Sequence, residues 1–265
     1  MSSASTVATL HRSDCLFLQV ALPGRSPENA GVLLLDVEAD RLHVRLRRDW
    51  SEMADEEEAE VLELFEHDIQ LKANELGADA FLRYLEGSAS NILRVTDREP
   101  MQVADFEARL RRLYKEYVNP KVLPYRTHLP VFTLRAAAGK FGGEMEVEPE
   151  EWEETPPELR VTTDMFLAHV TGRSMEPRIP DDSLCVFRAN VVGTRQGKLL
   201  LIENYGLSEN QGRYTVKRYR SEKQSTEEGW RHTKIVMEPL NPEFERWELE
   251  PGDFRVIGEF VRVLY

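Results

Sequence analysis

Residues 170–177 read VTGRSMEP, and this stretch decides how the second half of the chain is interpreted. An apolar run, residues 165–170, leads into it, so Ser174 follows an expected strand and a turn that contains Gly172. A serine in such a turn can expose its hydroxyl while backbone N–H groups nearby face a substrate carbonyl, as acyl transfer requires. Glu176 stands where the nucleophile elbow of α/β-hydrolases has glycine, so the motif is a different one.

Outward from this stretch, short apolar runs recur through residues 131–265. The runs are residues 165–170, 184–187, 199–202, 214–219, 235–237 and 256–264. Such spacing predicts a domain built mostly from β-strands. The run that begins at residue 214 reads YTVKR and contains Lys217, which lies 43 residues after Ser174. Because side chains alternate along a strand, Lys217 can face the interior while Arg218 stays in water.

These motifs resemble those of the self-cleaving LexA- and UmuD-type serine peptidases. The resemblance covers Ser-Met-x-Pro at residues 174–177, the apolar strand 184–187, the lysine strand around Lys217, and a tail that reads EPLNPEF at residues 238–244 and VIG at residues 256–258. It implies that Ser174 is the nucleophile and Lys217 its base, with Arg173 and Met175 in the loop that forms the oxyanion and substrate site. Residues 181–183 read DDS where the family has Asp-Gly-Asp, and we expect this difference to alter a turn without touching the dyad.

The implied mechanism requires a neutral lysine near neutral pH. The reference pKa of a lysine, ~10.4, must fall toward ~7–8 for this role. Burial lowers a lysine pKa because it penalises the charged form. We therefore expect Lys217 to be buried.

A second resemblance concerns the substrate. Residues 134–139 read LRAAAG, similar to the Ala-Gly segment at which LexA-like proteins cut themselves, and Gly139 lies 35 residues before Ser174. Small residues at Ala138 and Gly139 let a scissile backbone approach the nucleophile closely. The simpler interpretation is an ordinary Ala/Gly loop after a strand.

The first part of the chain mixes strand and helix patterns. Residues 32–48 alternate like a hairpin, Asp55 can cap a helix, and the stripe from Val103 to Tyr117 predicts a helix over residues 103–118. Prolines then mark a linker. The expected organisation is an α+β fold with an N-terminal α+β effector or sensor module at residues 1–118, a Pro-rich linker at 119–130 and a mostly-β peptidase domain at 131–265.

Composition narrows the functional classes. The 265 residues are enough for two domains, and the net charge of −13 is spread over two acidic halves, which argues against nucleic acid as the main partner. Residues 1–118 do not resemble a helix-turn-helix, so we expect no sequence-specific DNA binding from them. The two distant cysteines and the lack of a long apolar segment favour a cytoplasmic location without membrane contact. Histidines without ligand spacing and the absence of nucleotide-binding motifs predict no metal and no other cofactor.

The sequence thus predicts a cytoplasmic serine endopeptidase that cuts itself between Ala138 and Gly139 and releases its N-terminal module in a bacterial stress or phage-defence response. One alternative is a peptidase that cuts a partner protein recruited by residues 1–118. Another is a non-catalytic interaction module. The expected partners are a protein partner or activator and the chain's own cleavage loop. The sequence does not decide between a monomer and a homodimer.

Overall fold

The computed structural model describes residues 9–21, 26–88, 93–142, 145–208, 212–226 and 229–265. The chain forms two compact units, Met1–Lys121 and Val122–Tyr265. The first combines helices with a sheet and the second is rich in strands, which confirms the predicted α+β fold class. Among the described residues, no helix is long and apolar enough to cross a membrane.

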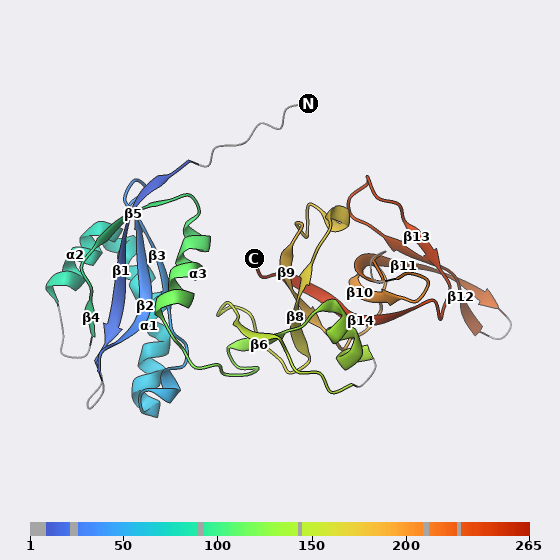
Figure 1. Cartoon of the computed structure of the whole chain (residues 1–265), viewed down its shortest axis with the longest axis horizontal. Helices are drawn as coiled ribbons and strands as arrows, with labels where there is room; N and C mark the ends of the chain where they lie inside the picture. Colours follow the sequence, from blue (N-terminus) through green and yellow to red (C-terminus); the bar gives the residue numbers. More distant parts are fainter. Residues whose placement is uncertain (1–8, 22–25, 89–92, 143–144, 209–211, 227–228) are drawn as a thin grey trace. The chain divides into compact units, whose positions relative to one another are not determined.

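The first unit is a five-stranded antiparallel sheet with helices on both faces (Figure 1). Its elements are β1 (His11–Val20), β2 (Glu28–Asp36), β3 (Arg41–Leu46), a 3₁₀ turn (Trp50–Glu52), α1 (Glu56–Leu76), α2 (Ala78–Gly87), β4 (Leu93–Val95), β5 (Glu99–Val103) and α3 (Phe106–Tyr117). The strand order is β3-β2-β1-β4, and β5 also pairs with β1.

The apolar run on β2 is buried on both of its sides. Leu33 and Leu35 pack in the cluster formed with α1 and α2, whereas Val32 and Leu34 pack in the cluster formed with α3. Alternate residues of a strand point to opposite faces, so a continuous apolar run needs cover on each face. The two sets of helices provide that cover.

The helix predicted over residues 103–118 begins later than its apolar stripe suggested. Val103 is the last residue of β5 and pairs with His11 of β1. The Asp105 side chain then caps α3 by accepting a hydrogen bond of 3.0 Å from the Ala108 N–H. Val103 fits both a helical stripe and a strand end, and the cap two residues later sets the boundary.

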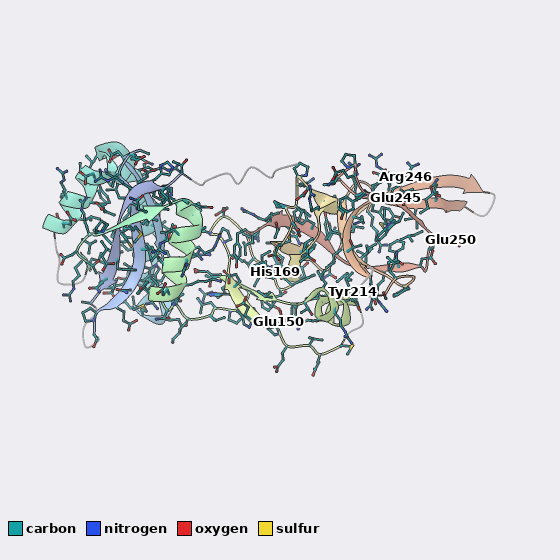
Figure 2. The ribbon with its side chains drawn as sticks, turned by 45° about the horizontal axis from the view of Figure 1, so that its top comes forward. Glu150, His169, Tyr214, Glu245, Arg246 and Glu250 are labelled. Atoms are coloured by element: carbon teal, nitrogen blue, oxygen red, sulfur yellow. The ribbon has the colours of Figure 1, made fainter. Side chains whose placement is uncertain are left out.

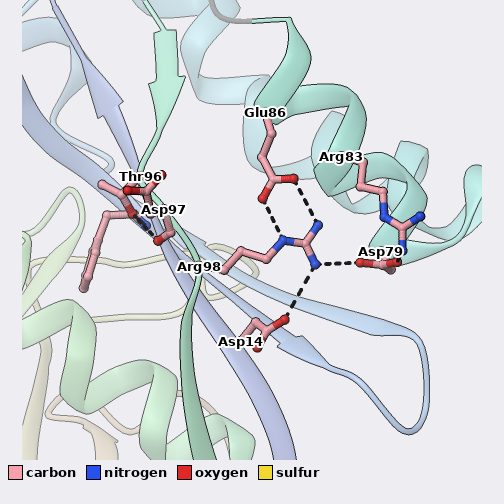
Figure 3. A network of polar contacts seen from close by, with 8 residues as sticks. Asp14, Asp79, Arg83, Glu86, Thr96, Asp97 and Arg98 are labelled. Atoms are coloured by element: carbon pink, nitrogen blue, oxygen red, sulfur yellow. Dashed lines mark hydrogen bonds and ion pairs between the residues drawn. The ribbon is translucent and has the colours of Figure 1, made fainter.

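A polar network fixes α2 to the sheet of this unit (Figure 3). The Arg98 guanidinium, just before β5, donates to Glu86 at 2.7 Å and to Asp79 at 2.6 Å, both on α2. It also lies 3.6 Å from the Asp14 carboxylate on β1. One half-buried arginine thereby joins three elements through charge-assisted contacts.

The second unit is built around one nine-stranded sheet. Its elements are β6 (His128–Val131), α4 (Leu134–Ala137), a π-helical turn (Ala138–Gly142), β7 (Glu151–Glu154), β8 (Met165–Val170), a 3₁₀ turn (Arg173–Met175), β9 (Ser183–Arg188), β10 (Leu199–Asn204), β11 (Tyr214–Thr226), β12 (Gly229–Glu238), β13 (Trp247–Leu249) and β14 (Phe254–Val263). The strand order is β13-β12-β11-β10-β14-β9-β8-β6-β7. Neighbours are antiparallel except for β6 and β8.

Two positions in this sheet matter for the site. β8 pairs with β9 up to Val170 and Ser183, so residues 171–182 form the connection beyond the ends of these strands. Lys217 lies within β11, opposite Leu200 of β10. The sheet therefore positions two parts of the site, the loop that contains Ser174 and the strand that contains Lys217.

The Ala/Gly segment is helical rather than an open loop. The Thr133 hydroxyl caps α4 by accepting a hydrogen bond of 3.0 Å from the Ala136 N–H. Ala138 and Gly139 follow in the π-helical turn, and the Met145 N–H donates to the Gly139 carbonyl at 3.1 Å. The alanines, which suit a close backbone approach, are also good helix formers.

Candidate active site

Ser174 lies in the short 3₁₀ turn Arg173–Met175 that follows β8. Gly172 enters this turn with a φ of 98°, a conformation that residues with a Cβ rarely adopt. The next side chain after the serine, Met175, is 2% exposed and packs in the core. The loop is thereby anchored on one side, while Ser174 itself stays partly exposed.

Hydrogen bonds from distant segments fix the backbone on both sides of Ser174. The N–H groups of Leu240 and Asn241 both donate to the Ser174 carbonyl at 3.0 Å, and the Asn241 side-chain amide donates to the Arg173 carbonyl at 3.1 Å. Asn241 is itself buried. These contacts position the serine loop against the chain just after β12.

The turn at residues 181–183 contacts the loop that carries Ser174. The Asp181 carboxylate accepts a hydrogen bond of 2.6 Å from the Gly172 N–H, two residues before Ser174. Asp182 takes a φ of 59° in the turn that starts β9. Asp181 is common to DDS and to the Asp-Gly-Asp pattern, so this support of the loop does not come from the difference. The two residues that differ, Asp182 and Ser183, lie in the turn and at the start of β9, and their lack of effect on the dyad stays a prediction.

Lys217 brings an amine to the serine hydroxyl from the centre of the sheet. Its Nζ lies 2.8 Å from the Ser174 Oγ, 3.0 Å from the Thr215 Oγ1 and 3.2 Å from the Val216 carbonyl oxygen. The side chain is 4% exposed, and this burial lowers the pKa of Lys217 to about 8. A substantial fraction of the amine is then neutral in mildly alkaline solution.

The three neighbours of the Lys217 amine suit both of its protonation states. A charged ammonium group donates three hydrogen bonds, which matches three oxygen atoms. A neutral amine donates two and accepts one, so it can keep Thr215 and the Val216 carbonyl while it accepts the hydroxyl proton of Ser174. This arrangement can move a proton from Ser174 to Lys217 without rearrangement of the surroundings.

An aromatic ring closes another side of the amine. The Lys217 Nζ lies 5.1 Å from the centre of the Trp247 ring, at the start of β13. Glu245 and Arg246, labelled in Figure 2, precede this residue on the segment that leads into the strand. The ring favours the charged amine through a cation–π contact, but burial disfavours it and dominates, since the pKa of Lys217 is lowered.

Histidine is the commoner partner of a catalytic serine, and His169 is the histidine nearest to Ser174 in the sequence. Figure 2 shows it on β8, where its side chain is exposed. Within the described residues, Lys217 is the basic side chain that contacts the Ser174 hydroxyl. The geometry thus offers a lysine, not a histidine, as proton acceptor.

The other predicted site residues take different places. The Arg173 side chain is 62% exposed and pairs with Glu176 at 3.1 Å, while Met175 is a core residue. Ala138 is 1% exposed and belongs to the same apolar cluster as Met175 and Val216. The structure therefore packs the Ala/Gly segment into the core that supports the serine and lysine, with the Ala138–Gly139 bond in a helical turn.

Thr215, Asp181, Asn241 and Trp247 received no role from the sequence. Thr215 could have been found, because residues two apart on a strand share a face and Thr215 precedes Lys217 by two. Asp181 lies further along the connection that carries Ser174 and contacts Gly172, whereas Asn241 and Trp247 lie on other segments that reach Ser174 and Lys217 through the fold. Among the described residues, no group of three His, Cys, Asp or Glu side chains is placed to hold a metal ion.

Comparison with protein families identifies the second unit. A β-rich domain with a lysine amine at a serine hydroxyl defines a class of peptidase fold, and residues 130–261 match the family described as peptidase S24-like. The C-terminal half of the chain belongs to this family, as its motifs predicted, and the protein is accordingly a serine peptidase of LexA-like type. Comparison with curated proteins gives no match.

Proposed function

We propose that Ser174 and Lys217 form a catalytic dyad that hydrolyses peptide bonds, and that the chain's own Ala138–Gly139 bond is a substrate. The observation that carries the proposal is the 2.8 Å contact between the Lys217 Nζ and the Ser174 Oγ, made by an amine whose burial lowers its pKa to about 8. Proximity and a lowered pKa are the two properties that a lysine base needs.

The proposed reaction has two stages. Neutral Lys217 accepts the hydroxyl proton as the Ser174 oxygen bonds to the scissile carbonyl carbon, and backbone N–H groups of the loop Arg173–Met175 stabilise the oxyanion. Charged Lys217 then gives its proton to the leaving amine as the C–N bond breaks, which leaves an acyl-serine. Water deprotonated by Lys217 hydrolyses this ester and restores the hydroxyl.

Self-cleavage requires a conformational step. A peptide bond attacked by Ser174 must expose its carbonyl, whereas Ala138 is buried and both residues of the bond lie in a helical turn. We propose that α4 and the turn after it unfold locally to present the bond, a minor state that an activating partner can stabilise. Helix α4 packs against β8, which leads into the serine loop, and against β11, which carries Lys217, so the segment stays close to both residues.

The same burial favours a second candidate function, cleavage of another protein in trans. A chain whose own bond is held in a helix leaves its dyad free for a partner's extended segment. For either substrate, we propose that residues 1–118 act as a protein-binding effector or sensor module without sequence-specific DNA affinity, in a stress or phage-defence response. The acidic composition supports a protein partner over nucleic acid.

The test is mass spectrometry of the purified full chain after alkaline incubation. Wild type should give fragments of about 16 and about 15 kDa, in proportion to the 30.6 kDa of the whole chain. Ser174→Ala and Lys217→Ala should stay whole and melt as folded proteins. A Lys217→Ala chain that cleaves at the wild-type rate would remove the lysine from the mechanism.

A matched pair at Gly139 separates self-cleavage from cleavage in trans. A Cβ at Gly139 would meet Met145 at 3.5 Å and Val147 at 3.8 Å, which are ordinary contacts, so substitutions there should fold. Gly139→Ala should still be cut, whereas the charged branch of Gly139→Asp should block the approach to Ser174. If the wild type stays whole while it cuts a partner protein, the trans function takes the place of self-cleavage.

A further inference from the structure

The second unit contains a cavity of about 430 Å³ that the proposed peptidase chemistry does not use. Ligand pockets hold ~300–1,000 Å³, so this one has room for a large side chain and a few neighbouring atoms. Its apolar wall consists of Ile235, Phe254 and Val256. Phe254 and Val256 are only partly buried against the apolar cluster of this sheet face, so they leave apolar surface toward the cavity.

Two polar groups that line the cavity have no partner within the part of the chain that the structure describes. Tyr219 is 5% exposed, yet its hydroxyl makes no hydrogen bond there. The exposed Arg195 guanidinium likewise has no hydrogen bond or ion pair. A nearly buried hydroxyl without a partner is costly, so a ligand that bonds to it contributes binding free energy.

The charged groups beside the cavity define the sign of its ligand. Arg255 also lines the cavity but is paired with the buried Glu203 carboxylate. The turn before β14 contains Asp253, whose carboxylate accepts a hydrogen bond of 2.8 Å from the Glu250 N–H (Figure 2 labels Glu250). Neither of these two acids lines the cavity. Among the described lining residues, Arg195 is therefore the cation without a counterion, and it favours an anionic ligand.

The cavity lies on the same face of the sheet as Lys217. Tyr219 follows Lys217 by two residues on β11, and alternate residues of a strand share a face. Two residues of a strand extend about 7 Å, so two or three residues of an extended peptide span the distance between these positions. A substrate that reaches the dyad can thus also reach the cavity.

From these observations we infer that the cavity binds a segment of a partner protein in which a large apolar residue is followed by Asp or Glu. The apolar side chain fills the cavity, and the carboxylate accepts hydrogen bonds from the Arg195 guanidinium and the Tyr219 hydroxyl. The chain's own cleavage segment, residues 134–142, reads LRAAAGKFG and has no acidic residue, so it does not supply this ligand. The inference rests on the proposed peptidase function and gives its trans form a substrate class.

The test measures peptide binding to the full chain with Ser174→Ala, so that cleavage cannot consume the probe. The probe is Gly-Gly-Phe-Glu-Gly-Gly with blocked ends, and two control peptides replace its Glu by Gln or its Phe by Ala. In NMR titrations observed on the peptide, the probe should bind at least about ten-fold more tightly than either control. Added salt should weaken binding of the probe more than that of the Gln control.

Protein variants locate the contact. Arg195→Gln should remove the preference for Glu over Gln, and Tyr219→Phe, which keeps the ring, should weaken binding of the probe several-fold. Arg160→Gln is the matched control and should bind as wild type. Arg160 is also exposed and without a partner among the described residues, but its neighbours Leu159 and Val161 pack in a different apolar cluster.

Two outcomes would overturn the inference. The probe could bind no more tightly than its two controls, or Arg195→Gln could keep the preference for Glu over Gln. A failure of the proposed peptidase function is a separate result, because it would appear as the absence of cleavage by the wild-type chain while the Ser174→Ala chain still bound the probe.

Discussion

At the scale of single residues, burial of the Lys217 amine carries a cost in free energy. Lys217 is charged in the unfolded chain up to a pKa near 10.5, but burial lowers its pKa to about 8 in the folded protein. Below pH 8 the folded state must therefore hold a charge that its surroundings disfavour. Active sites commonly carry such residues at the expense of stability.

Replacement of this lysine should stabilise the protein. A pKa lowered from 10.5 to about 8 corresponds to about 3 kcal/mol of unfavourable free energy when the folded amine is charged. Lys217→Met keeps the length of the side chain, removes the charge and loses contacts with Ser174 and Thr215. We expect the free energy of unfolding at pH 7 to increase by about 2 kcal/mol.

The difference in unfolding free energy between wild type and Lys217→Met should change with pH in one direction. Between the two pKa values the unfolded state binds a proton that the folded state lacks, so wild-type stability rises with pH through this window and the advantage of Lys217→Met disappears by about pH 10.5. Urea melts of both chains in a Ser174→Ala background measure this. A difference that is constant with pH would show that Lys217 is not perturbed in the folded protein.

Asn241 is expected to act by positioning the serine loop. Asn241→Ala removes the side-chain bond to the Arg173 carbonyl while the backbone bond to Ser174 remains. We expect a loss of about 1 kcal/mol of stability and roughly ten-fold slower cleavage, with an unchanged pH midpoint because Lys217 is untouched. Glu243→Ala is the control. Glu243 donates its backbone N–H to the Asn241 side chain, and the alanine variant keeps this N–H. Equal rates for Asn241→Ala and wild type would remove this role.

At the scale of elements, β13 places the Trp247 ring 5.1 Å from the Lys217 amine, and we expect this ring to limit access of water to the amine. Trp247→Ala removes a cation–π contact, which lowers the pKa of Lys217, and also admits water, which raises it. Desolvation is the larger effect, so the midpoint of the pH–rate profile should move up by about one pH unit, with about ten-fold slower cleavage at pH 7.

Trp152→Ala is the matched control for this strand. Trp152 is also a half-buried tryptophan on a short edge strand, β7, but it packs against Tyr125. Its removal should lower the melting temperature and leave the pH midpoint in place. A downward shift of the midpoint in Trp247→Ala would mean that the ring stabilises the charged amine more than it excludes water.

Elements with a strong apolar pattern could be predicted, and those with a mixed pattern could not. β8 spans residues 165–170 as predicted, because five of its side chains are buried in a run that polar residues interrupt only at His169. β7 could not be predicted, because its acidic residues lack the apolar alternation that indicates a strand. The structure nevertheless buries Glu153 there. The helical start of the Ala/Gly segment depends on packing, which small residues do not reveal.

At the scale of the whole molecule, the site combines segments that the sequence keeps far apart. The serine loop follows β8, the lysine lies on β11, Asn241 follows β12 and Trp247 begins β13. Motif resemblance could predict the serine and the lysine, since both lie in recognisable strings of residues. Strand alternation could predict Thr215 beside Lys217. The other supporting contacts could not be predicted, because each depends on the register and connection of the sheet rather than on neighbours in the chain.

The claim that neutral Lys217 activates Ser174 is tested most directly by the rate of self-cleavage as a function of pH, followed by intact mass in the full chain. The neutral fraction of the amine rises about ten-fold per pH unit below its pKa, so the rate should climb with pH, reach half its maximum near the pKa of about 8 and then level off. Ser174→Ala and Lys217→Met should show no cleavage at any pH. Wild-type cleavage that is independent of pH between about 6 and about 10, or persists in Lys217→Met, would contradict the account.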